Sequence, residues 1–374
     1  MTGRDKKKGL GANLLLLAVV LFICLIAAEV VLRFTWKGFR PHRSTQTLSY
    51  DDTLGWVGKI NSETLLSEGG IKVPCRINNW GFRDYRSYPI DKTSGKHRLL
   101  ILGDSFVMGT GIAEEARVSQ QLEAQDSSII AYNFGIMGYS TDQELLVLKK
   151  YGPQVQPDDI FLFFCANDLI YNDSDFGHKI PKPHFRLNAD GSLNLGNVPV
   201  PNLINKNPVL MWLQNNSALV QITSKITAQL SFQNKLKRQR HTAGDLGLER
   251  GERGKADLDS LLLFSSEKKT SDLTYHLLKE VKAETDRLGA RFILFTAPSN
   301  QHWTATRNET PEEIGRVLNW CEELNIEAVD LFPVFYQNFN EYGEKLYLPD
   351  KMHWNERGNR IAAEAIYHLL GNFQ

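Results

Sequence analysis

Apolar positions concentrate near the N-terminus, where residues 10–31 are apolar apart from Asn13 and Glu29. About 20 such residues are enough for a helix to cross the hydrocarbon core of a bilayer. A cleaved signal peptide is the competing interpretation, but the run is long for one and no small-residue cleavage site follows it. The pattern therefore predicts a transmembrane anchor over residues 10–31, preceded by a basic tail over residues 1–9.

Basic residues flank this segment equally on both sides, so the positive-inside rule does not orient it. The two groups are Arg4, Lys6, Lys7 and Lys8 before the segment, and Arg33, Lys37, Arg40 and Arg43 after it. The short N-terminal flank and the large C-terminal body favour export of the body. We expect a single-pass protein of the inner (cytoplasmic) membrane whose main domain is periplasmic or otherwise extracytoplasmic.

From residue 98 onward, short apolar runs alternate with stretches of helical periodicity, a pattern typical of parallel βαβ units. Strands are expected at residues 99–102, 128–134, 159–164, 291–296 and 326–331. Helices are expected at residues 115–124, 141–151, 271–288, 311–324 and 356–370. The fold class predicted for residues 98–374 is α/β, a flavodoxin-like three-layer α/β/α domain with a mostly parallel five-stranded sheet.

Two segments do not follow this alternation. Residues 32–97 are rich in turns and are expected to form a juxtamembrane arm that packs on the main domain through Trp80 and Phe82. Arg83, in the same arm, is expected to pair with a carboxylate rather than to contact substrate.

The second segment is an insertion over residues 171–266, which contains proline-rich stretches, an expected helix at 208–230 and a charged run at 235–257. That charged run is typical of a solvated or disordered loop. Because the insertion follows the carboxyl end of a strand, it is placed where it could cover a site at that edge of the sheet.

Composition narrows the functional classes. The 374 residues include 43 Lys and Arg and 43 Asp and Glu, a balance that gives no support to nucleic-acid binding. The apolar fraction of 42% supports a sizeable core, and four cysteines are too few for a disulfide framework. Cys75 and Cys321 could pair in an oxidising compartment or remain buried thiols.

Candidate chemistry begins where the first expected strand ends, at Gly103-Asp104-Ser105. Open α/β sheets bind ligands beyond the carboxyl ends of their strands, and a serine on a sharp turn there suits a nucleophile. A plain turn is the alternative, because these residue types are common in turns. Near the C-terminus, Asp350 precedes His353 by three residues and could orient its imidazole, which leaves Nε2 free to accept a serine proton.

Two further residues follow other expected strands. Gly138 comes after the second strand and Asn167 after the third, so both should meet the edge that carries Ser105. A backbone N–H and a side-chain amide are suitable donors for an oxyanion formed during acyl transfer.

Taken together, these motifs resemble the SGNH, or GDSL-like, hydrolase superfamily, over about residues 98–170 and 270–370. The resemblance implies that Ser105, Asp350 and His353 are catalytic and that Ser105, Gly138 and Asn167 form the oxyanion hole. The membrane-anchored bacterial branch is the most similar, partly through residues 79–83. Two positions depart from the family pattern, since Phe106 and Ala166 stand where smaller residues are usual.

The resemblance implies a membrane-tethered serine esterase that hydrolyses an O-acyl ester, above all O-acetyl, on a cell-envelope polysaccharide. The alternatives are an O-acyltransferase that acts on a glycan with a membrane partner protein, and a non-catalytic polysaccharide assembly or binding subunit. No cofactor or metal is expected, because the scattered histidines show no metal-ligand spacing. The expected partners are an acylated glycan substrate and the membrane, and no nucleic acid.

Overall fold

The computed structural model describes residues 3–36, 48–68, 71–90, 95–177, 180–202, 213, 216–223, 226, 267–299, 309–350 and 352–371. The chain divides into two compact units, Met1–Arg43 with Asn205–Gly254, and Ser44–Ile204 with Lys255–Gln374. The expected charged run at 235–257 lies outside the described residues, as does most of the expected helix at 208–230.

The first unit contains helix α1 (Gly3–Thr35), which includes the expected anchor. Its segment Leu15–Thr35 has a mean hydropathy of 3.1 and is long and apolar enough to cross a membrane, although a signal sequence would pass the same test. Within this unit the Glu29 carboxylate accepts hydrogen bonds from the Ser217 hydroxyl at 2.8 Å and from the backbone N–H of Ala218 at 2.9 Å.

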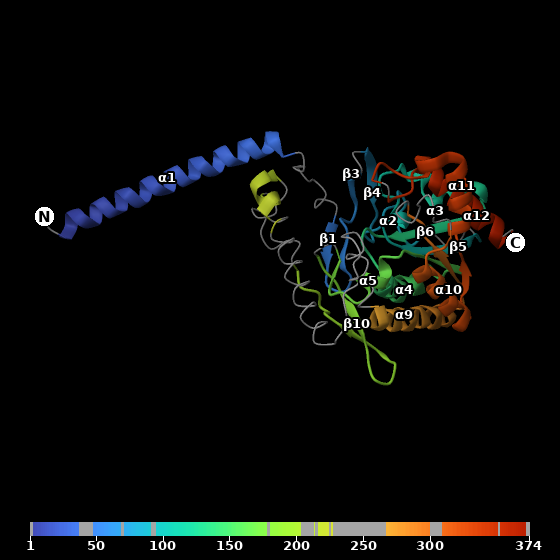
Figure 1. The fold of residues 1–374 in the computed structure, drawn as a ribbon. Coiled ribbons are helices and arrows are strands. Elements are labelled where there is room, and N and C mark those ends of the chain that lie inside the picture. The colour runs from blue at the N-terminus through green and yellow to red at the C-terminus, as the bar shows by residue number, and fades with distance from the viewer. Residues whose placement is uncertain are drawn as a thin grey trace, which may run out of the picture. The chain divides into compact units, whose positions relative to one another are not determined.

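A five-stranded parallel sheet forms the centre of the second unit. Its strands are β5 (His97–Gly103), β6 (Ile129–Gly135), β7 (Asp159–Phe164), β12 (Arg291–Thr296) and β13 (Glu327–Val329). They lie in the order β13-β12-β7-β5-β6, and every neighbouring pair is parallel. Figure 1 labels β5 and β6, which pair with each other in this sheet. This is the flavodoxin-like order, with its switch point beside β5. The predicted sheet and fold class are confirmed.

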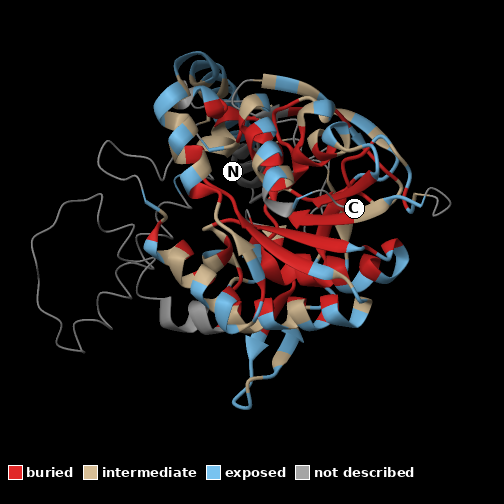
Figure 2. Ribbon diagram, turned by 90° about the vertical axis from the view of Figure 1, so that its right-hand side faces the viewer, coloured by how far each residue is buried: buried red, intermediate tan, exposed pale blue. Residues whose placement is uncertain are grey.

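Helices cover both faces of the sheet. One layer contains α3 (Val118–Gln125) and α12 (Glu356–Leu370), with α11 (Phe332–Tyr342) packed against α12; the other contains α4 (Thr141–Val155), α9 (Glu267–Leu288) and α10 (Glu312–Glu323). The inner strands between these layers are largely buried (Figure 2), as expected for a parallel sheet with both faces covered, whereas the edge strand β13 is exposed or half-buried.

Some expected elements differ from those in the structure. The helix expected at 115–124 is divided into a 3₁₀ turn (Glu114–Ala116) and α3, and the strand expected at 326–331 is shortened to β13. Helix α11 and a second 3₁₀ turn (Gly343–Leu346) were not predicted. Helix α4 has the expected start but no solvent-exposed polar face in its first turn, because Asp142, Gln143 and Glu144 are all fully buried.

The arm before the sheet forms two antiparallel hairpins. They pair β1 (Leu48–Asp51) with β2 (Gly55–Gly58), and β3 (Ser62–Glu68) with β4 (Ile71–Ile77). The Phe82 ring meets Phe134 at 4.5 Å between centroids, and the Trp80 ring stacks on Tyr151 at 4.9 Å. The predicted packing of Trp80 and Phe82 on the main domain is therefore confirmed.

The prediction that Arg83 pairs with a carboxylate was wrong. Its fully buried guanidinium donates to backbone carbonyls rather than to a carboxylate, including those of Ile112 at 2.9 Å, Pro74 at 3.1 Å and Met108 at 3.3 Å. Burial, and then repulsion from Arg117, lower the pKa of Arg83 to about 10. Backbone carbonyls can accept hydrogen bonds from an arginine as a carboxylate would, and sequence spacing does not distinguish the two.

The first part of the insertion belongs to the second unit. It begins at the end of α5 (Asp168–Tyr171) and contains two antiparallel pairs, β8 (Phe176–Gly177) with β9 (Ile180–Pro181) and β10 (His184–Leu187) with β11 (Leu193–Gly196). Lys182 lies between these pairs and is completely buried. The four cysteines are all free thiols.

Candidate active site

The short helix α2 (Ser105–Met108) places Ser105 directly after β5. Asp104 caps this helix, because its carboxylate accepts the Phe106 N–H at 2.9 Å. Glycine is required at position 135 on the neighbouring strand, since a Cβ atom there would lie 2.2 Å from the backbone nitrogen of Met108. The serine is thus presented on a tightly packed turn at the carboxyl edge of the sheet.

Ser105, His353 and Asp350 form a continuous hydrogen-bond chain. His353 Nε2 lies 2.7 Å from Ser105 Oγ, and His353 Nδ1 lies 2.6 Å from Asp350 Oδ2. The other carboxylate oxygen, Asp350 Oδ1, accepts the backbone N–H groups of Met352 at 2.8 Å and His353 at 3.1 Å. Nucleophile, base and orienting acid therefore stand in the arrangement that acyl transfer requires.

The Asp350 carboxylate is held in its ionised form. Burial raises the pKa of this group, but the His353 side chain and the Met352 N–H donate to its oxygens and bring the pKa below its usual value. An ionised Asp350 keeps the proton on His353 Nδ1, so Nε2 can accept the Ser105 proton.

The surroundings of Phe106 explain how a large residue is accommodated directly after Ser105, where the family usually has a smaller one. Its ring lies 5.4 Å from the His353 ring and 5.0 Å from the Trp354 ring, centroid to centroid. The Trp354 indole N–H donates to the Pro298 carbonyl at 2.6 Å, so this aromatic support is anchored to the end of β12. A large residue after the serine thus packs beside the imidazole instead of obstructing it.

Gly138 occupies a β-turn after β6. The Tyr139 N–H donates to the Ile136 carbonyl at 3.1 Å, and Gly138 has a φ of 76° while the φ of Met137 is not positive. These values are typical of a type II turn, whose third position needs a positive φ and therefore favours glycine. The pairing of Gly103 with Gly135 places this turn at the same edge as Ser105.

Asn167 follows β7, the strand on the other side of β5, and stands at the N-cap position of α5, where its side chain makes no capping hydrogen bond. Burial raises the pKa of Asp104, and the Phe106 N–H and the Asn167 side chain partly offset that rise by hydrogen bonding to the carboxylate. Asn167 therefore lies against the residue that precedes Ser105. Ala166, the other departure, has no positive φ and needs no glycine.

A buried polar cluster behind this edge was not predicted. Lys182 forms a fully buried ion pair with Asp142, and its Nζ also donates to Ser140 Oγ at 3.1 Å. Burial, followed by the neighbouring carboxylates, raises the pKa of Glu144 and of Asp168 well above the usual range. The only sequence signal was the run of polar residues at the start of a helix that otherwise packs on the sheet.

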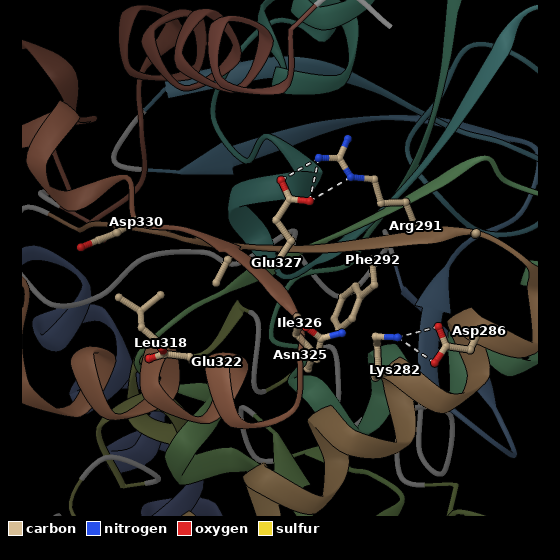
Figure 3. Close-up of a pocket in the computed structure, with 12 residues that line it drawn as sticks. Lys282, Asp286, Arg291, Phe292, Leu318, Glu322, Asn325, Ile326, Glu327 and Asp330 are labelled. Atoms are coloured by element: carbon tan, nitrogen blue, oxygen red, sulfur yellow. Dashed lines mark hydrogen bonds and ion pairs between the residues drawn. The ribbon is translucent and has the colours of Figure 1, made fainter.

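A hollow of about 720 Å³ lies elsewhere, between α9, α10, β12 and β13 (Figure 3). Its lining includes the exposed Arg291–Glu327 ion pair, at 2.6 Å, and none of the five predicted site residues. The Arg291 and Glu327 side chains satisfy each other there, so nothing about the lining indicates a reaction.

No family model and no curated protein sequence matches the chain. The structure is similar to solved structures of ester-cleaving enzymes. A member of the lipolytic G-D-S-L family from Veillonella parvula has a TM-score of 0.39 and 12% identity, with 72% of this chain and 94% of that chain covered. An acetyl xylan esterase from Geobacillus stearothermophilus has a TM-score of 0.39 and 17% identity, with 74% and 96% covered. Likeness at this level does not establish an activity, which depends on the residues of the site itself.

Proposed function

We propose that the chain is a membrane-tethered serine esterase of the SGNH type, which removes O-acyl groups, above all O-acetyl, from a cell-envelope polysaccharide. The observation that carries the proposal is the Ser105–His353–Asp350 hydrogen-bond chain, with distances of 2.7 Å and 2.6 Å. A binding-only subunit has no need of all three groups in this geometry.

The reaction begins when His353 Nε2 takes the proton of Ser105 Oγ and the oxygen forms a bond to the ester carbonyl carbon. The oxyanion that results is bound by the backbone N–H groups of Ser105 and Gly138 and by the Asn167 amide. The first N–H groups of a helix have no partner within it, which makes that of Ser105 suitable. The imidazolium then protonates the leaving alcohol oxygen as the C–O bond breaks, which leaves an acyl-Ser105 intermediate.

Water completes the cycle. His353 takes a proton from water as its oxygen attacks the acyl carbon, and the tetrahedral species collapses to release the carboxylic acid and restore the Ser105 hydroxyl. A sugar hydroxyl in place of water would make the same centre an acyltransferase. No step needs a metal or an organic cofactor.

Two features support a cell-envelope polysaccharide as the substrate. They are the resemblance to membrane-anchored bacterial members of the superfamily and the apolar segment of α1. We place α1 in the inner membrane as a single span and the second unit on the periplasmic or extracytoplasmic side. The arm of residues 32–97 and the catalytic domain of 98–374, with its insertion at 171–266, follow this anchor.

The test uses the full chain in detergent micelles with a partially O-acetylated polysaccharide, and acetate release is followed by NMR. The proposal predicts acetate release that Ser105→Ala abolishes, whereas Ser128→Ala, a change at an exposed serine, leaves it intact. Transfer of acetyl groups to an added glycan acceptor, without free acetate, would favour the transferase. Equal activity in the wild type and Ser105→Ala would contradict both.

A further inference from the structure

We propose that the indole N–H of Trp56, in the N-terminal arm, fixes the orientation of the peptide group that supplies the Gly138 N–H to the oxyanion. Trp56 Nε1 donates to the Met137 carbonyl oxygen at 3.1 Å. That carbonyl and the Gly138 N–H belong to one peptide unit. The inference rests on the proposed function, because it assigns a positioning residue to that reaction.

Peptide geometry links the Met137 carbonyl to the Gly138 N–H. A trans peptide is planar, and its C=O and N–H bonds point in opposite directions. A donor that holds the Met137 carbonyl on one side therefore directs the Gly138 N–H to the other. Donation to the carbonyl also polarises the peptide unit, which makes its N–H a better hydrogen-bond donor.

This peptide unit needs such support because it is the central one of the turn from Ile136 to Tyr139. Types I and II of a β-turn differ chiefly by a flip of the central peptide, and glycine at the third position accepts either backbone conformation. Gly138 itself therefore does not hold the type II form that its φ of 76° indicates. The Trp56 hydrogen bond stabilises that form.

Trp56 is itself held firmly. It is 1% exposed, and its ring packs edge-on against Tyr139 at 5.6 Å between centroids. The Tyr139 hydroxyl donates to the Trp56 carbonyl, so the arm and the turn are joined twice. Gly177 completes the contact, since a Cβ atom there would lie 2.6 Å from Trp56 Cη2 and 3.2 Å from the Gly138 carbonyl oxygen.

The test is the kinetics of p-nitrophenyl acetate hydrolysis by the full chain in detergent, with Ser105→Ala as the background. Trp56→Phe keeps a buried ring but loses the N–H donor. Trp80→Phe is the matched control, because it shortens another aromatic side chain of the same arm whose ring packs on Tyr151. Thermal unfolding is measured for each variant.

We expect Trp56→Phe to lower kcat about tenfold or more with KM unchanged, since an interaction made only in the transition state affects kcat and kcat/KM equally. The loss should stay below the roughly 10²–10³ that removal of a whole oxyanion donor causes. Trp80→Phe should keep the wild-type kcat. If Trp56→Phe fails to fold, Gly177→Ala, which displaces the indole, should give the same selective loss of kcat.

A folded Trp56→Phe with the wild-type kcat would overturn the inference and leave the proposed function intact. Equal losses in Trp56→Phe and Trp80→Phe would also overturn it, because they would indicate general loosening of the arm. A wild-type rate no higher than that of Ser105→Ala would instead overturn the proposed function, and the inference with it.

Discussion

His353 Nε2 lies 2.7 Å from Ser105 Oγ, although 248 positions separate the two residues in the sequence. The parallel sheet is the reason for this proximity. Ser105 follows β5 at its carboxyl edge, and Trp354, next to His353, is anchored to the Pro298 carbonyl just beyond β12 at that same edge.

Asn167→Ala should lower kcat for an ester substrate by about 10²–10³, the loss typical for one oxyanion donor, with a smaller effect on KM. The variant should remain folded, because Asn167 is only partly buried. Steady-state kinetics with p-nitrophenyl acetate provide the measurement, and Asn188→Ala, in the exposed β10–β11 hairpin, is the control. If Asn167→Ala keeps the wild-type kcat, Asn167 does not donate to the oxyanion.

Asp350→Asn should lower kcat by about 10⁴ near neutral pH, because an amide no longer selects the imidazole tautomer with a free Nε2. The native Asp350 is suited to this role, since hydrogen bonds from His353 and Met352 outweigh the effect of burial and lower the pKa of the carboxyl group. Stopped assays at high enzyme concentration can follow so slow a variant. Asp158→Asn, at a carboxylate that is 54% exposed, should be as active as the wild type, and a loss limited to a few-fold in Asp350→Asn would contradict the assignment.

Glu144→Gln should make the protein more stable at alkaline pH. Burial, and then the carboxylates of Asp168 and Asp104, raise the pKa of Glu144 well above the usual range, so the folded chain keeps a proton that the unfolded chain releases above about pH 4.5. Wild-type stability therefore falls as pH rises from there to the folded-state pKa, by up to about 1.4 kcal/mol per pH unit for one proton. Gln mimics the neutral acid and removes this dependence.

Urea unfolding of the wild type and Glu144→Gln at several pH values measures that difference. We expect the stability of the variant relative to the wild type to increase with pH. Glu115→Gln changes an exposed carboxylate on the same unit, and its free energy of unfolding should vary with pH as that of the wild type does. Parallel curves for Glu144→Gln would show that Glu144 does not hold a proton in the folded state.

The sequence was sufficient to predict the sheet, because buried parallel strands appear as short apolar runs and are recognisable without tertiary context. The strand at 159–164 and the helix at 356–370 were predicted at the bounds observed, and the Asn355 side chain caps that helix by accepting the Gly358 N–H at 3.0 Å. The Ser105–His353–Asp350 hydrogen-bond chain could be anticipated because the Asp-x-x-His spacing and the Gly-Asp-Ser turn are local patterns.

Interactions between distant polar residues could not be predicted in the same way. Arg83 binds carbonyls around α2, and Lys182 enters the core from the insertion to pair with Asp142. Trp56 reaches Met137 across 81 positions. Each contact depends on how the arm or the insertion packs on the sheet, which no periodicity in either partner's own segment reveals.

Covalent labelling of the full chain with a fluorophosphonate tests the role of Ser105 as nucleophile most directly. Ser105 Oγ should displace fluoride from phosphorus as His353 takes its proton, which gives one phosphonyl group per chain. Mass spectrometry of the digested protein should locate that group on Ser105, and Ser105→Ala should remain unlabelled. Labelling at another residue, or a wild type that stays unlabelled while folded, would contradict the assignment of Ser105 as the nucleophile.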